Sequence, residues 1–109
     1  MILNTKYVLH IPTHKFENER VTRINMEKVI ADLEKRLNQN DFHSFYKTEV
    51  EGHYKRRIFD ELLITIFTSE STQPQPDEIF SKWFKDNNYE LKQESFAYEK
   101  NNELYIEKL

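Results

Sequence analysis

Cysteine is absent from this 109-residue sequence, and glycine occurs only once. Without cysteine the chain can form neither disulfide bonds nor a thiolate metal site, and a secreted location gains no support. A single glycine leaves no Gly-rich loop of the kind that cradles nucleotide phosphates. These absences exclude a disulfide-stapled fold and the common nucleotide-binding motifs.

Long apolar runs and concentrated positive charge are also missing. No run approaches the ~18 to 20 apolar residues that span a bilayer, and the N-terminus lacks the apolar region of a signal peptide. The net charge is −3 with both signs spread along the chain, whereas phosphate binding needs a cationic surface. We therefore expect a soluble, cytoplasmic protein that binds neither membranes nor nucleic acid.

Aromatic residues make up 14% of the sequence and are expected to supply most of the core. Each buried ring removes roughly 150 to 250 Å² from water. A chain of 109 residues is long enough for one hydrophobic core and too short for two. We therefore expect a single domain over residues 1–109.

The most strongly β-forming stretch spans residues 62–67, where large apolar or β-branched side chains occupy nearly every position. Successive strand residues point to opposite faces, so this pattern predicts a central strand covered on both sides. The apolar run at residues 6–11 predicts another central strand. Residues 45–59 alternate polar with apolar side chains, which is typical of an edge strand, and Gly52 is expected at a bulge or bend.

Two amphipathic helices are expected, each with apolar residues spaced three and four apart. The first begins after Asn25, a plausible N-cap, and runs to about Gln39. The second begins at Pro76, which needs no amide partner in the first turn, and ends at residues 86–88. Residues 13–23 are mostly polar and are expected to form a surface loop. The aromatic stripe of the second helix, which includes Trp83, is expected to be core rather than a ligand box.

The order strand, helix, strand, strand, helix, strand predicts an α+β fold of the ferredoxin-like βαββαβ type. That plait has a four-stranded antiparallel sheet in the order 4-1-3-2, with both helices on one face. Residues 93–109 can fold as a hairpin around Asn101 and Asn102, because asparagine tolerates left-handed turn positions. The C-terminal hairpin would add a further strand.

In this fold no helix would pack on the sheet face opposite the two helices. Val8, Leu63, Phe67 and Phe96 are expected to populate or flank that face. A bare apolar face of several hundred Å² is unusual on a monomer. We therefore predict a homodimer or higher assembly that packs sheet against sheet through these four residues, with a protein partner as the alternative.

From Gly52 onward the sequence resembles an uncharacterised family of small ferredoxin-like proteins of unknown function. The matching features are a glycine followed two residues later by an aromatic, a glutamate before an apolar strand, an aromatic in a helix and a Gln-Glu-Ser opening the last strand. They correspond here to Gly52, Tyr54, Glu61, residues 62–67, Tyr89, Gln93, Glu94 and Ser95. The usual aromatic after the glycine is tryptophan, and the first strand lacks the family's glycine-containing turn. The resemblance implies a fold and not an established activity.

His10 is the strongest single candidate for a functional side chain, because histidine titrates near neutral pH. It could carry a proton in a pocket between helices and sheet, with Tyr7 or Tyr98 as further polar groups. His10 and His14 have a metal-ligand spacing, but Pro12 breaks the helical geometry that this spacing requires, so no metal is expected. The alternative interpretation is that His10 has a purely structural role as a half-buried sheet residue.

His53 and Arg57 could bind an anionic ligand together with the neighbouring basic residues. Consecutive strand residues alternate faces, however, so a solvated hairpin tip is the favoured interpretation. Glu49 and Glu51 share one strand face, which a wet edge strand explains. No motif for nucleophilic catalysis is present, and no cofactor is implied.

Three functions remain open at this point. The first is a non-enzymatic oligomeric module that binds a partner protein or small molecule. The second is a cofactor-independent small enzyme of the dimeric ferredoxin-like type, which rests on fold analogy. The third is a small acidic inhibitor from a mobile element. A pocket of ~300 Å³ or more with converging polar groups would favour the enzyme.

Overall fold

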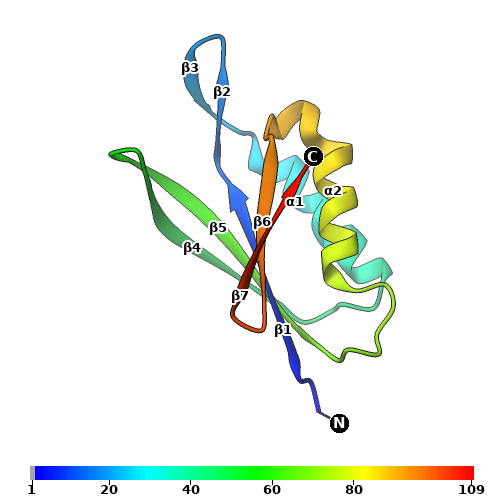
Figure 1. Ribbon diagram of the computed structural model, residues 1–109. Helices are drawn as coiled ribbons and strands as arrows, with labels where there is room; N and C mark the ends of the chain where they lie inside the picture. The colour runs from blue at the N-terminus through cyan, green and yellow to red at the C-terminus, as the bar shows by residue number, and fades with distance from the viewer. Residues whose placement is uncertain (1) are drawn as a thin grey trace.

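The computed structural model describes residues 2–109 as a mixed α+β fold with two helices, a five-stranded sheet and a separate two-stranded sheet (Figure 1). In chain order the elements are β1 (Thr5–Pro12), β2 (His14–Glu17), β3 (Arg20–Arg23), α1 (Met26–Gln39), β4 (Phe45–Tyr54), β5 (Arg57–Thr68), α2 (Pro76–Leu91), β6 (Ser95–Lys100) and β7 (Glu103–Lys108).

The larger sheet has the strand order β4-β5-β1-β6-β7, and every neighbouring pair is antiparallel. Strand β5 contains the apolar stretch 62–67 and pairs with β4 on one side and β1 on the other, which confirms it as a central strand. The C-terminal hairpin also forms, so β7 adds a fifth strand outside β6. Both helices lie beside each other on one face of the sheet (Figure 1).

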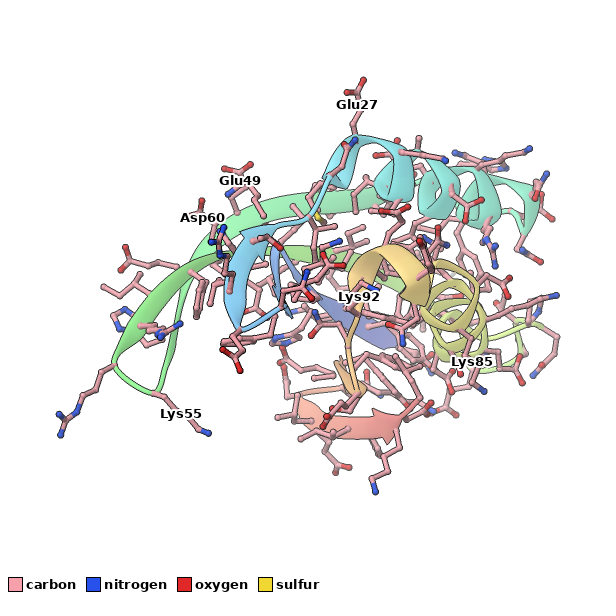
Figure 2. All side chains as sticks on the ribbon, turned by 90° about the horizontal axis from the view of Figure 1, so that it is seen from above. Glu27, Glu49, Lys55, Asp60, Lys85 and Lys92 are labelled. Carbon is pink, nitrogen blue, oxygen red and sulfur yellow. The ribbon has the colours of Figure 1, made fainter. Side chains whose placement is uncertain are left out.

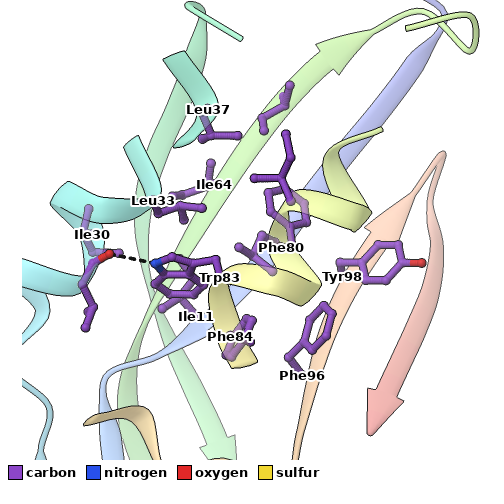
Figure 3. Packing of buried hydrophobic residues seen from close by; sticks show 14 of the residues in the cluster. Ile11, Ile30, Leu33, Leu37, Ile64, Phe80, Trp83, Phe84, Phe96 and Tyr98 are labelled. Carbon is purple, nitrogen blue, oxygen red and sulfur yellow. Dashed lines mark hydrogen bonds between the residues drawn. The ribbon is translucent and has the colours of Figure 1, made fainter. Parts of the chain in front are cut away.

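The core fills the layer between the helices and the sheet. Tyr7, Leu9 and Ile11 alternate along β1 and have no exposed surface, because they face the helices. Trp83 of α2 is also fully buried, and its indole Nε1 donates a hydrogen bond to the Val29 carbonyl of α1 at 2.9 Å (Figure 3). This bond ties the two helices together inside the core. Within residues 2–109, neither helix is long and apolar enough to cross a membrane.

The prediction of a loop at residues 13–23 is wrong, because β2 and β3 form a hairpin there. Phe16 pairs with Val21, and the two turn residues Asn18 and Glu19 have φ values of 51° and 62°. These strands are mostly polar, so they lack the apolar run that predicts a strand. Their turn contains no glycine, so it also lacks the usual sequence signal for a hairpin turn.

The C-terminal end of α2 also lies beyond the expected position. The helix continues past residues 86–88 to Leu91, whose side chain is fully buried. Asn87 does not break the helix, because its side-chain amide donates to the Trp83 carbonyl one turn earlier at 3.0 Å. The helix ends at Lys92, which adopts the left-handed conformation with φ 48°.

The pairing of β4 with β5 runs through Gly52 without a bulge, contrary to expectation. Gly52 lies opposite Phe59, and the residues on either side keep the same register. The hairpin turns at Lys55 and Arg56, which have φ values of 48° and 66°. Gly52 is therefore not explained by a bulge, and its role concerns the neighbouring Glu61 side chain.

Candidate functional site

The uncovered face of the sheet is organised in rows that the strand register defines. In the middle row, His10 of β1 lies between Leu63 of β5 and Ala97 of β6. In one adjacent row, Val8 lies between Thr65 and Glu99. On the other side, Pro12 lies opposite Glu61. Side chains at paired positions share a face, so His10, Glu61 and Glu99 all project from this open face.

Three of the four residues expected at the open face lie there. Val8 is 7% exposed between its neighbours, Leu63 is partly buried, and Phe67 is 44% exposed. Phe96 was placed wrongly, since it belongs to the core under the helices. Its ring stacks on Phe84 of α2 with centroids 4.6 Å apart, because the register of β6 turns Phe96 to the helix face. The residue of β6 that faces outward is Ala97.

His10 lies between two carboxylates from two different strands. Its Nδ1 is 3.2 Å from Oε1 of Glu61, and its Nε2 is 2.7 Å from Oε2 of Glu99. Each of the three side chains keeps about a third or less of its surface exposed, at 28% for His10, 30% for Glu61 and 32% for Glu99. A histidine can donate through both ring nitrogens only as the imidazolium cation. The arrangement therefore suits a charged histidine.

The pKa of His10 reflects this environment. The hydrogen bond to Glu61 raises the pKa of His10 most strongly, and burial opposes it by disfavouring the charged ring. The hydrogen bond to Glu99 acts in the same direction as the bond to Glu61, so the pKa of His10 is raised overall. The carboxylates outweigh burial because the site is only partly shielded from water.

Gly52 makes room for the Glu61 carboxylate. A Cβ atom at position 52 would lie 2.9 Å from Oε2 of Glu61, closer than real Cβ contacts. Oε1 of the same carboxylate is directed at His10. The hydrogen bond to His10 thus holds one oxygen of Glu61, and the absence of a side chain at Gly52 leaves space for the other.

A cleft of about 700 Å³ opens beside Glu61. Its walls come from the β2–β3 hairpin, the adjoining parts of β4 and β5, and the segment that joins α2 to β6. The lining includes Gly52, Glu61, the aromatic side chains of Phe16, His14 and Phe59, and two lysines, Lys15 and Lys92. The rings of His14 and Phe59 have centroids 5.2 Å apart. An acidic group, aromatic surface and basic groups therefore border one space.

Tyr7 and Tyr98 do not share a site with His10, because they lie on the opposite face of the sheet. Their rings stack at 6.2 Å, and the Tyr7 hydroxyl donates to Gln75 at 3.0 Å and to Asp77 at 3.2 Å. Burial raises the pKa of Tyr98 to about 12 and the pKa of Tyr7 further. Both phenols therefore stay protonated and serve the core.

His53 and Arg57 lie near the cleft but do not converge with His10. His53 lines the cleft, is two-thirds exposed and interacts with Glu51 at 3.2 Å. The Arg57 guanidinium lies 5.9 Å from the ring centroid of Phe16, which also lines the cleft. Among residues 2–109 no group of three or more His, Asp and Glu side chains is arranged to hold a metal ion.

A second hollow, of about 530 Å³, lies between the outer surfaces of α1 and α2. Arg36 crosses it and interacts with Asp32 at 3.0 Å and Asp86 at 2.9 Å. Among the described residues its lining contains no aromatic side chain, whereas Phe16 and Phe59 border the cleft beside Glu61. The cleft beside Glu61 is therefore the better candidate for ligand binding.

Sequence reasoning singled out His10 but missed its two carboxylate partners. Glu61 and Glu99 lie 51 and 89 positions away from His10, so only the strand register brings them together. One signal was available, because Glu61 immediately precedes the apolar part of a central strand. A charged residue at that position needs a partner.

Comparison with known proteins gives a structural likeness without a sequence relationship. No protein-family model matches the sequence, and no curated protein matches it. Among solved structures, a phage SAM lyase in the apo state aligns with a TM-score of 0.55 and 14% identity, over 96% of this chain and 89% of that chain. A phage SAM lyase in complex with S-methyl-5'-thioadenosine aligns over the same fractions with a TM-score of 0.49 and 13% identity. At this identity the likeness concerns the fold alone.

Proposed function

We propose that this protein is a small cofactor-independent lyase that acts on a sulfonium substrate of the S-adenosylmethionine type in the cleft beside Glu61. The observation that carries the proposal is the Glu61 carboxylate, which His10 holds at the edge of an open cleft, with room for its second oxygen above Gly52. A carboxylate fixed in a partly desolvated position attracts a cation more strongly than one free in water.

The cleft has the dimensions and the groups that such a substrate needs. A volume of about 700 Å³ falls within the usual range for small-molecule sites. Phe16 and Phe59 offer aromatic faces for a purine ring or for the sulfonium cation. Lys15 and Lys92 lie along the wall and can attract a substrate carboxylate, although both also approach Glu17, at 3.5 Å and 3.8 Å.

The fold supports this proposal by analogy with the apo phage SAM lyase, whose structure covers almost the whole chain. Strands β6, β1, β5 and β4, with the helices on one face, also support a description of the core as a ferredoxin-like βαββαβ plait extended by β7. Because such folds host many chemistries, the carboxylate and the cleft carry more weight than the topology.

The direct test is turnover of S-adenosylmethionine by the purified protein. Elimination across the four-carbon chain breaks its carbon–sulfur bond and leaves the electron pair on sulfur, so S-methyl-5'-thioadenosine is the expected product. We expect its concentration, measured by liquid chromatography and mass spectrometry, to rise in proportion to protein. S-Adenosylmethionine also decomposes slowly in buffer, so heat-denatured protein is the blank. A rate equal to that blank would reject the proposal.

The released four-carbon fragment reports the role of Glu61. Attack by the substrate's own carboxylate gives a lactone and needs no external base, so Glu61 would then act by electrostatic attraction alone. Removal of a proton by Glu61 gives an alkene instead. The two fragments are isomers, so proton NMR of the product mixture distinguishes them where mass does not.

We also propose that the protein self-associates through the open sheet face. Tyr46, Phe67, Leu104 and Ile106 are 66%, 44%, 59% and 69% exposed, and the strand register places all four on this face. Tyr46, Phe67 and Leu104 lie toward the end of the sheet away from the cleft, so association there leaves the cleft accessible. Burial of apolar surface on this scale favours association.

The mass in solution tests this proposal. At micromolar concentration, light scattering after gel filtration should give a multiple of the 13.4 kDa chain mass. The double variant Phe67→Glu with Ile106→Glu should return the mass of one chain, whereas Tyr89→Glu, an exposed position on α2, should not change the assembly. A wild-type protein that stays at the mass of one chain would contradict it.

A further inference from the structure

We propose that His10 is a positioning residue: as an imidazolium anchored by Glu99, it fixes the Glu61 carboxylate at the mouth of the cleft. This inference rests on the proposed function, because it assigns His10, which lies outside the cleft lining, a role in the chemistry of Glu61. The result is a chain of three side chains across β6, β1 and β5.

The geometry gives each member a separate task. Glu99 holds Nε2 of His10 at 2.7 Å, a length typical of a hydrogen bond between charged groups. That bond orients the ring, and Nδ1 then donates to Oε1 of Glu61 at 3.2 Å. Glu99 is absent from the cleft lining, so it has no direct contact with a ligand there and is linked to the cleft through His10.

No other charged group competes at the centre of this arrangement within the described strands. The face positions of β5 and β6 paired with His10 are occupied by Leu63 and Ala97. The outer strands place Val50 opposite Glu61 and Leu104 opposite Glu99. The helices pack on the other face. The charge of His10 therefore depends mainly on Glu61 and Glu99.

The protonation state of His10 sets the direction of the pH effect. The two carboxylates raise the pKa of His10, so the imidazolium persists above the ordinary value near 6.5. When pH rises through the pKa of the folded protein, the ring loses a proton and can donate to only one carboxylate. The contribution of this ion pair to folding stability follows the same sign: it is complete below the pKa of the unfolded chain and is lost through the folded pKa.

The experiment compares wild type with His10→Ala and Glu99→Gln, and uses His43→Gln as a matched control. His43 is an exposed histidine that interacts with Asn38 and Asp41 in the segment between α1 and β4. We expect kcat of His10→Ala to fall about tenfold, as loss of about 1.4 kcal/mol of transition-state stabilisation would produce. For Glu99→Gln we expect the alkaline decline of kcat to move to lower pH. His43→Gln should follow the wild-type profile.

Two measurements do not depend on turnover. Nitrogen-15 NMR across a pH titration should show that His10 keeps both ring nitrogens protonated to a higher pH than an ordinary histidine, and Glu99→Gln should lower this pKa. A crystal structure of His10→Ala should show the Glu61 carboxylate displaced from its position above Gly52. These readouts report on the arrangement even if S-adenosylmethionine is not the substrate.

Each outcome bears on a separate claim. A His10 pKa that is not raised above that of an ordinary histidine, or a Glu61 carboxylate that stays in place without His10, would overturn the positioning role. Wild-type pH profiles in an active Glu99→Gln enzyme would also overturn it. An inactive wild-type protein that has the expected NMR and crystallographic results would reject the lyase proposal but retain the positioning of Glu61.

Discussion

Replacement of Glu61 by glutamine should reduce turnover of S-adenosylmethionine by at least about a hundredfold, the low end of what a positioned catalytic carboxylate contributes. Glutamine keeps the size of the side chain and removes the negative charge. The Glu61 carboxylate borders the cleft, with Oε1 directed at His10 and Oε2 above Gly52. A neutral amide in that place attracts a sulfonium cation much more weakly than a carboxylate does.

The control for this variant is Glu49→Gln, which makes the same chemical change on the neighbouring strand β4. Glu49 is exposed and pairs with Leu62, one position from Glu61, but its register places it on the other side of the sheet (Figure 2). Turnover is measured for both variants by the appearance of S-methyl-5'-thioadenosine, and far-UV circular dichroism verifies that each is folded. Equal activity of Glu61→Gln and wild type would remove Glu61 from the site.

The sequence contained enough information to identify the elements whose hydrophobic pattern is strong. Residues 62–67 are apolar on both faces, and they do form a central strand. The spacing of apolar residues also located α1, and the suitability of Pro76 for a first helical turn located the start of α2. The turn at Asn101 and Asn102 follows from the tolerance of asparagine for positive φ. These features depend on local chemistry, which a single sequence displays.

The features that failed depend on contacts between distant parts of the chain. The β2–β3 hairpin is polar, and its pairing, rather than its composition, makes it a hairpin. Phe96 was assigned to the wrong face because alternation shows that two faces differ but does not tell which one the helices cover. The partners of His10 come from β5 and β6, and no spacing rule connects residues that far apart.

Replacement of Trp83 by alanine should lower the free energy of unfolding by about 3 to 5 kcal/mol, the usual cost of removing a large ring from a core. Trp83 has no exposed surface, and its ring meets Phe84 edge-on with centroids 4.8 Å apart. Since domains are commonly stable by about 5 to 15 kcal/mol, this loss would remove a substantial share of the free energy of unfolding. Trp83 is the only tryptophan, so urea unfolding must be followed by circular dichroism rather than by its fluorescence.

A second variant separates the hydrogen bond of Trp83 from its volume. Trp83→Phe keeps an aromatic ring in the core but leaves the Val29 carbonyl without the indole donor that reaches it at 2.9 Å. The Val29 carbonyl lies inside α1 and keeps its intrahelical N–H partner, so loss of the indole hydrogen bond should cost about 0.5 to 1.5 kcal/mol. The smaller ring also leaves a cavity, and the total loss in free energy of unfolding should lie below that of Trp83→Ala. Tyr89→Ala, at an exposed position on the same helix, should change stability by less than about 0.5 kcal/mol. If Trp83→Ala were no more destabilising than Tyr89→Ala, the helices would not be held to each other and to the sheet by the packing around Trp83.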